Sequence, residues 1–136
     1  MVALAGITAV RSTSNTVEDN VPYGATIASG VPVYLDASDS KHKPTDANLS
    51  SSAATAKGIA VTPGVDGGYG LIAIRGSIIL VGTTMAVGTT YYCGPTAGEI
   101  IPETDLATGD NIMRLGMAAT ATQLDLDIKL MGIVHP

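Results

Sequence analysis

The eight residues from Gln123 to Leu130 alternate strictly between polar and apolar side chains. Successive side chains of a β-strand point to opposite faces, so an alternation of period two is typical of a strand that is buried on one face. The sequence therefore predicts a half-buried strand here. Its outer face carries Asp125, Asp127 and Lys129, which we expect to form an exposed surface of mixed charge.

Most of the chain from Gly30 onwards repeats this plan in short apolar runs that end at Gly, Pro, Asp or Asn. Turn signals at such close spacing favour a sandwich or barrel over alternating strands and helices. We therefore expect a mainly β fold, a single compact antiparallel β-sandwich or barrel with at most one short helix, at 48–57, and an extended N-terminal arm. Strands are expected at 31–35, 58–61, 69–75, 77–81, 100–101 and 111–119, the last paired in a hairpin with 123–130. Gly76 is expected as a bulge or corner, 36–46 as a polar surface loop, and 63–68 as a turn with positive φ.

The first 23 residues differ from the rest, so we expect an N-terminal arm at 1–23 and one β-rich domain at 24–136. An apolar tip precedes a polar tether that begins at Arg11. Such a segment has no strong reason to fold alone, and it is expected to dock on the domain or on a neighbouring subunit. In the alternative interpretation, residues 3–10 are the first strand of the domain's own sheet. The apolar residues of the tip are Val2, Leu4, Ile7 and Val10.

The composition argues against several classes of function. Hydrophobic residues make up 46% of the chain and charged residues 14%, with neither Phe nor Trp, which predicts an aliphatic core and apolar surface covered by partner subunits. The net charge of −5, with basic residues scattered, argues against nucleic-acid binding. No apolar stretch is long enough to span a bilayer, and Arg11 follows the first apolar stretch, which is the wrong order for a signal peptide. Cys93 is the single cysteine, and we expect it to be buried.

No motif for catalysis or cofactor binding interrupts the series, and we expect neither an enzyme nor a cofactor or metal site. Three aspartates, Asp36, Asp39 and Asp46, share one polar loop, but their spacing does not fit a calcium loop. The two histidines, His42 and His135, have no partner cluster for zinc. The glycines at 64–70 lack the lysine of a phosphate loop and predict a hairpin turn instead.

The order of the segments carries a resemblance. The runs at 30–36 (GVPVYLD), 57–61 (KGIAV), 70–78 (GLIAIRGSI), 87–92 (VGTTYY), 97–102 (AGEIIP), 105–109 (DLATG), 115–118 (LGMA) and 121–126 (ATQLDL) follow one another in this order. The series covers roughly residues 24 to 131 and resembles the capsid decoration (cement) proteins of tailed bacteriophages. Similar strings occur in phage tail-fibre modules, so a β module of a tail fibre or baseplate is the alternative.

The resemblance implies a structural virion protein that is made in the host cytoplasm and binds the outer surface of the phage head. It implies binding to the major capsid protein and a homotrimer at local three-fold positions, with a dimer as the next choice. In this family an N-terminal arm often reaches neighbouring capsid subunits. By this resemblance, the expected capsid contacts are Val2, Leu4, Ile7, Val10 and Arg11.

Overall fold

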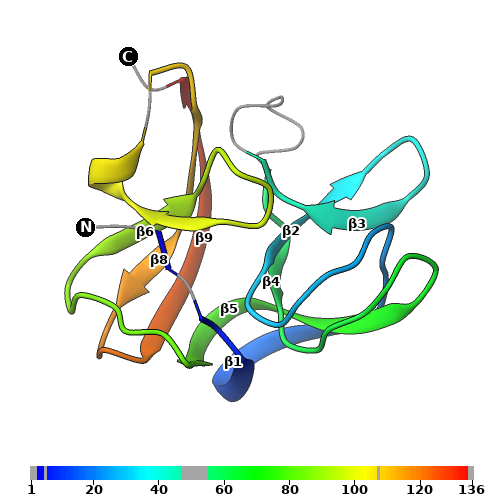
Figure 1. Ribbon diagram of the computed structural model, residues 1–136, viewed down its shortest axis with the longest axis horizontal. Helices are drawn as coiled ribbons and strands as arrows, with labels where there is room; N and C mark the ends of the chain where they lie inside the picture. The colour runs from blue at the N-terminus through cyan, green and yellow to red at the C-terminus, as the bar shows by residue number, and fades with distance from the viewer. Residues whose placement is uncertain (1–2, 5, 47–54, 107, 135–136) are drawn as a thin grey trace.

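The computed structural model describes residues 3–4, 6–46, 55–106 and 108–134, and these form a mainly β, antiparallel sheet that curls into a half-barrel (Figure 1). This confirms the predicted fold class. The described residues contain no α-helix and only a short 3-10 turn, η1 (Glu103–Asp105), and no helix among them could cross a membrane. Most of the helix expected at 48–57 lies outside the described residues. The strands are β1 (Ala9–Pro22), β2 (Pro32–Asp36), β3 (Lys41–Pro44), β4 (Gly58–Ala60), β5 (Tyr69–Val81), β6 (Thr90–Cys93), β7 (Ile100–Pro102), β8 (Asn111–Ala118) and β9 (Gln123–Val134).

Strand β5 organises the sheet, because one of its edges is shared by two different strands. Along one edge it pairs with β1. Along the other edge, β4 pairs with Ile72 and Ala73, and β9 pairs with the stretch from Arg75 to Ile79. The sheet therefore forks at Ile74 into one wing of β4, β2 and β3 and another of β9, β8, β6 and β7. Figure 1 shows the two wings rising on either side of β5.

The predicted hairpin of β8 and β9 is confirmed by the pairs Ala118 with Leu124 and Met117 with Asp125. Leu124 and Leu126 are buried, whereas Asp125, Asp127 and Lys129 are exposed. The expected mixed-charge face is therefore present. Burial of one face fixes the register, because a slip by one residue would turn the leucines outward.

Two expectations about strand boundaries were wrong. The strands expected at 69–75 and 77–81 are one strand, β5, in which Gly76 adopts φ +89° without breaking the pairing. The register between β1 and β5 shifts between Ser12 and Asn15, and Asn15 is the residue that pairs with Gly76. The irregularity expected at Gly76 is therefore a shift in strand pairing, and β5 itself continues through it. The polar segment 36–46 is not a loop throughout, because β3 pairs with β2 and turns His42 inward.

Hydrophobic side chains form two buried clusters on opposite faces of β4 and β5. Ile59 and Ala73 belong to the larger cluster, whereas their chain neighbours Ala60 and Ile72 belong to the smaller one. Successive residues of a strand point to opposite faces, so this short part of the sheet is buried on both sides. That explains why β4 reads in the sequence as a continuous apolar run rather than an alternating one.

Tyr23 is part of the smaller cluster. Because the chain contains neither Phe nor Trp, a tyrosine supplies the large aromatic side chain of this core. Its side chain is fully buried, and its hydroxyl donates a hydrogen bond to the carbonyl of Thr62 over 2.9 Å. The ring lies directly against Gly64 and Gly70, where a methyl group would overlap it. The glycines of the 64–70 segment therefore serve ring packing as well as the turn, in which Gly67 adopts the expected positive φ of +86°.

Candidate functional site

The described apolar residues of the expected N-terminal arm pack on the protein's own core. Val10 is only 8% exposed and is part of the larger cluster, and Leu4 and Ile7 pack against that cluster while remaining partly buried. Arg11 is exposed, and Val2 lies outside the described residues. A partner could contact Val10 only if the start of β1 first left β5.

The N-terminal segment also connects parts of the sheet that are distant in sequence. The amide of Leu4 donates to the carbonyl of Ile100 over 2.9 Å, and the amide of Thr8 donates to the carbonyl of Val81 over 2.8 Å. On the opposite wing, Ile7 lies against Gly30, where a Cβ atom would sit 2.6 Å from its side chain. For Ala9 and Val10, this arrangement matches the alternative in which the segment is the first strand of the domain's own sheet.

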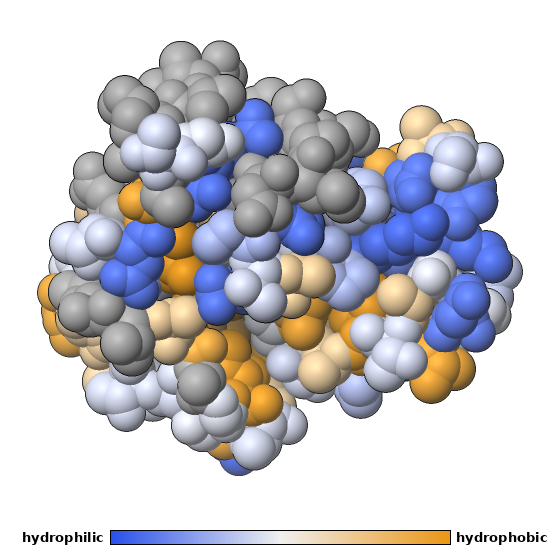
Figure 2. Space-filling model, turned by 45° about the horizontal axis from the view of Figure 1, so that its top comes forward, coloured by the Kyte–Doolittle hydropathy of each residue, from blue (hydrophilic) through white to orange (hydrophobic). Residues whose placement is uncertain are grey.

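A charged network stiffens the tip of the β2–β3 hairpin. The ammonium group of Lys43 lies 2.7 Å from a carboxylate oxygen of Asp36 and 3.1 Å from one of Asp39. The hydrogen bond from Lys43, followed by those from Ser38, holds the pKa of Asp36 far below its usual range. Asp36 and Asp39, the two carboxylate partners of Lys43, in turn raise the pKa of its ammonium group. Figure 2 shows hydrophilic residues gathered at this end of the molecule, over the hairpin.

The same network lies where the aspartates of this loop would bind a cation. An ammonium group already lies between Asp36 and Asp39, where a bound cation would have to compete with it. Among the described residues, no group of three or more His, Cys, Asp and Glu side chains is placed to hold a metal ion. The tip of the hairpin is therefore best described as a polar surface with internal ion pairs.

Cys93 and His42 are both built into the interior. Cys93 is fully buried, and burial raises the pKa of its thiol to about 12, so the reactive thiolate is scarce at neutral pH. His42 is 6% exposed, and its Nδ1 atom lies 3.2 Å from the carbonyl oxygen of Pro22. Burial of Cys93 was predicted, whereas the inward position of His42 was not.

An open apolar hollow lies where two loops meet, between β1 and β2 and between β4 and β5. The hollow measures about 450 Å³, and Val65 on its rim is 61% exposed. Two hydrogen bonds of 2.9 Å, exchanged between the backbones of Ile27 and Gly64, hold the two loops together. We call this surface the Val65 hollow; its lining residues are Thr26, Ile27, Ala28, Pro63, Gly64 and Val65.

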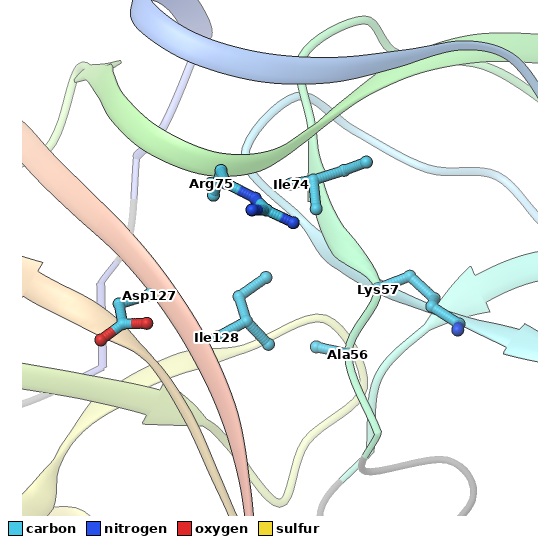
Figure 3. Close-up of a pocket in the computed structure, with 6 residues that line it drawn as sticks. All are labelled: Ala56, Lys57, Ile74, Arg75, Asp127 and Ile128. Atoms are coloured by element: carbon cyan, nitrogen blue, oxygen red, sulfur yellow. The ribbon is translucent and has the colours of Figure 1, made fainter.

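A second hollow, the fork cleft, opens where β4 and β9 separate from β5. It measures about 390 Å³ and is lined by Ala56, Lys57, Ile74, Arg75, Asp127 and Ile128. In Figure 3, the guanidinium group of Arg75 and the side chain of Ile128 project into the gap, whereas the carboxylate of Asp127 points away from it. This cleft joins residues from three separate parts of the chain.

The fork cleft was not predicted from the sequence. Asp127 was assigned only to the mixed-charge face, Lys57 to the end of the helix expected at 48–57, and Arg75 to the strand expected at 69–75. The single available signal is an arginine next to a glycine inside an apolar strand, and that pattern does not say which strands diverge there. The surfaces suited to binding are thus the Val65 hollow and the fork cleft.

The chain was also compared with known proteins. No family model matches it, and no curated protein was found to match its sequence.

Proposed function

We propose that this protein is a structural virion component that binds the outer surface of a tailed-phage head and holds neighbouring major capsid subunits together. Two lines of reasoning support the proposal. The order of the short β segments resembles the decoration proteins, and the antiparallel half-barrel belongs to the fold class that this resemblance implies. Such a role requires complementary surfaces rather than a catalytic centre.

The observation that carries the proposal is the Val65 hollow. A large apolar side chain that is 61% exposed on a hydrogen-bonded pair of loops is a preformed surface, so binding loses little loop entropy. Apolar surface that is ordered and open to solvent is typical of protein-interaction sites. Val65 has an exposed apolar counterpart in Val87, which is 67% exposed but does not line the hollow.

The proposed mechanism is linkage between binding and assembly. A protein that contacts two or more capsid subunits at once binds the assembled shell more strongly than separated subunits. Its binding free energy is then lost when the subunits part, which stabilises the shell by mass action. Association as a homotrimer, with a dimer as the next choice, would multiply the contacts made by each particle. This part of the proposal follows the family resemblance.

The test is the location and copy number of the protein in purified particles. Heads and tails of the phage that encodes it are separated on a density gradient, and the protein is quantified by mass spectrometry against the major capsid protein. We expect it on heads, at a number near that of the capsid three-folds. Absence from heads would overturn the proposal, and enrichment in tails would favour the tail-fibre or baseplate module.

A binding assay then tests the role of the Val65 hollow. Heads stripped of the protein are mixed with purified wild type, Val65→Ser or Val87→Ser, and the bound protein is measured after sedimentation. We expect Val65→Ser to bind at least tenfold more weakly, in the range for an interface residue that loses its buried contacts. Val87→Ser, the matched control, should bind as wild type does. Equal binding by both variants would remove the hollow from the interface.

A further inference from the structure

The fork cleft combines a cationic group with an apolar surface. In the part of the chain that the structure describes, neither Arg75 nor Lys57 takes part in an ion pair. Figure 3 shows the Arg75 guanidinium reaching into the gap beside Ile128, while Lys57 lies at the opposite rim with its side chain turned outward. An arginine beside apolar side chains attracts an anion more strongly than one fully surrounded by water.

The acid opposite Arg75 on β9 forms no ion pair with it. Asp127 is its cross-strand partner, yet a carboxylate oxygen of Asp127 lies 3.5 Å from the Lys129 ammonium and 3.9 Å from the Arg114 guanidinium. The stretches that adjoin Ala56 and Ile128 in the sequence, 47–54 and 130–136, contain neither Asp nor Glu. Neither stretch can therefore supply a carboxylate side chain to pair with Arg75. The local positive charge also contrasts with the net charge of −5.

One wall of the cleft is a strand edge, and the other is the segment Ala56–Lys57 that leads into β4. Strand β9 continues to Val134 and pairs with β8, but its pairing with β5 ends at Asp127. On the other wall, the amide of Lys57 donates to Val33 over 2.7 Å, towards β2 and away from the cleft. Beyond Asp127, therefore, the edge of β9 that faces the fork has no strand partner within the described ranges. An extended chain can add to such an edge through main-chain hydrogen bonds.

We propose that the fork cleft binds an extended acidic segment of a partner polypeptide, with one carboxylate on Arg75 and an apolar side chain over Ile128 and Ala56. The charge of the cleft selects the carboxylate, and the free edge of β9 selects a peptide over a small molecule. Under the proposed function, on which the identity of this partner rests, the segment belongs to a capsid subunit. Binding is tested without any capsid, so the two proposals can fail separately.

The test uses isotope-labelled full-length protein and a synthetic peptide. The probe is a pentapeptide with blocked ends, in which a central glutamate is flanked by valines and then threonines, and the control peptide carries glutamine in place of glutamate. Titration is followed in nitrogen–proton NMR correlation spectra. We expect saturable shifts confined to the fork cleft with the glutamate peptide, weakening as salt is added, and much smaller shifts with the glutamine peptide.

Variants assign the binding to Arg75. Arg75→Gln should weaken binding by about fivefold, the size expected for one partly shielded ion pair. Lys57→Gln should weaken it less, because that side chain is turned outward, and it provides a second readout if Arg75→Gln does not fold. Lys41→Gln is the control, because it makes the same change of charge at a residue that does not line the cleft. The ammonium group of Lys41 lies 3.7 Å from a carboxylate oxygen of Asp66.

Three results would overturn the proposal. The first is no saturable shift, or equal binding of the glutamate and glutamine peptides. The second is a peptide affinity that neither Arg75→Gln nor Lys57→Gln reduces. The third is binding of butyrate as tightly as the glutamate peptide, because the cleft would then take small carboxylates rather than a polypeptide segment.

Discussion

The amide of Gly98 donates a hydrogen bond of 2.8 Å to the carbonyl of Thr45, and this bond joins the two wings of the sheet. Gly98 lies in the turn between β6 and β7, whereas Thr45 directly follows β3. The wings that part at Ile74 therefore meet again, and the larger core cluster lies between them, with Ile59 from one wing and Cys93 from the other. Within the described part of the chain, the two wings are thus joined by a loop contact and not by a pair of strands.

This closing contact predicts that Gly98→Ala is more destabilising than a comparable change elsewhere. Gly98 has φ +78°, which costs a non-glycine residue about 1–2 kcal/mol, and the new methyl would lie 3.1 Å from Val31 on the opposite wing. Gly88→Ala is the matched control, because its φ is +80° but no atom lies near the added methyl. Urea denaturation should give the larger loss for Gly98→Ala. Equal losses would mean that the space between Gly98 and Val31 accommodates the methyl group, so that the close approach of the wings does not constrain this position.

The buried position of Val10 predicts that the N-terminal segment supports the fold. Val10→Ala removes two methyl groups from the larger core cluster and should lower the free energy of unfolding by about 2 kcal/mol. Arg11→Ala is the neighbouring control and should stay within about 0.5 kcal/mol of wild type, because Arg11 is exposed. Both are measured by chemical denaturation.

Deletion of residues 2–12 extends the same test to the expected arm. Because it removes the start of β1 along with Leu4 and Ile7, we expect the truncated chain to lose its cooperative unfolding transition. A truncated protein that folds normally but no longer binds heads would restore the interpretation of the segment as a free capsid-binding arm. Circular dichroism and head sedimentation distinguish the two results.

The ion pairs of Lys43 predict a stability contribution that depends on pH. The pKa of Asp36 is lowered in the folded state, so its contribution is fully present above the unfolded value of about 4 and is lost as the pH falls through the folded value. Lys43→Met should therefore destabilise the protein at neutral pH, with a difference from wild type that shrinks steadily below about pH 4. Lys41→Met should have a smaller effect, because the Lys41–Asp66 pair is longer and more exposed. A difference from wild type that does not change with pH would contradict the assignment to Asp36.

The buried thiol predicts that Cys93 reacts only when the protein unfolds. At pH 8 the native protein should react with a thiol-specific dye orders of magnitude more slowly than the denatured protein, because the pKa of Cys93 is raised to about 12 and the sulfur is inaccessible. The labelling rate should rise in Val10→Ala, since both residues belong to one cluster. Rapid stoichiometric labelling of the native protein would show that the wings separate readily.

Local pattern in the sequence determined the class of the fold and many of its strands. The alternation at 123–130, its hairpin with the strand expected at 111–119 and the turn at 63–68 were all predicted, because side-chain periodicity and glycine chemistry act between residues close in the chain. Burial of Cys93 was predicted for a similar reason, since a lone cysteine in an apolar chain behaves as a small hydrophobe. The family resemblance supplied the functional hypothesis, which stays a prediction.

Only the tertiary structure determined where strands meet and part. The sequence does not say that β4 and β9 share one edge of β5, so it contains no visible sign that Arg75, Ala56 and Ile128 form a cleft. Nor does it say that Val10 is part of the protein's own sheet, since an apolar strand and an apolar arm have the same composition. The physical reason is that the pairing of distant strands depends on contacts between residues far apart in the chain. Local periodicity says which face of a strand is apolar, but it does not say which strand lies beside it.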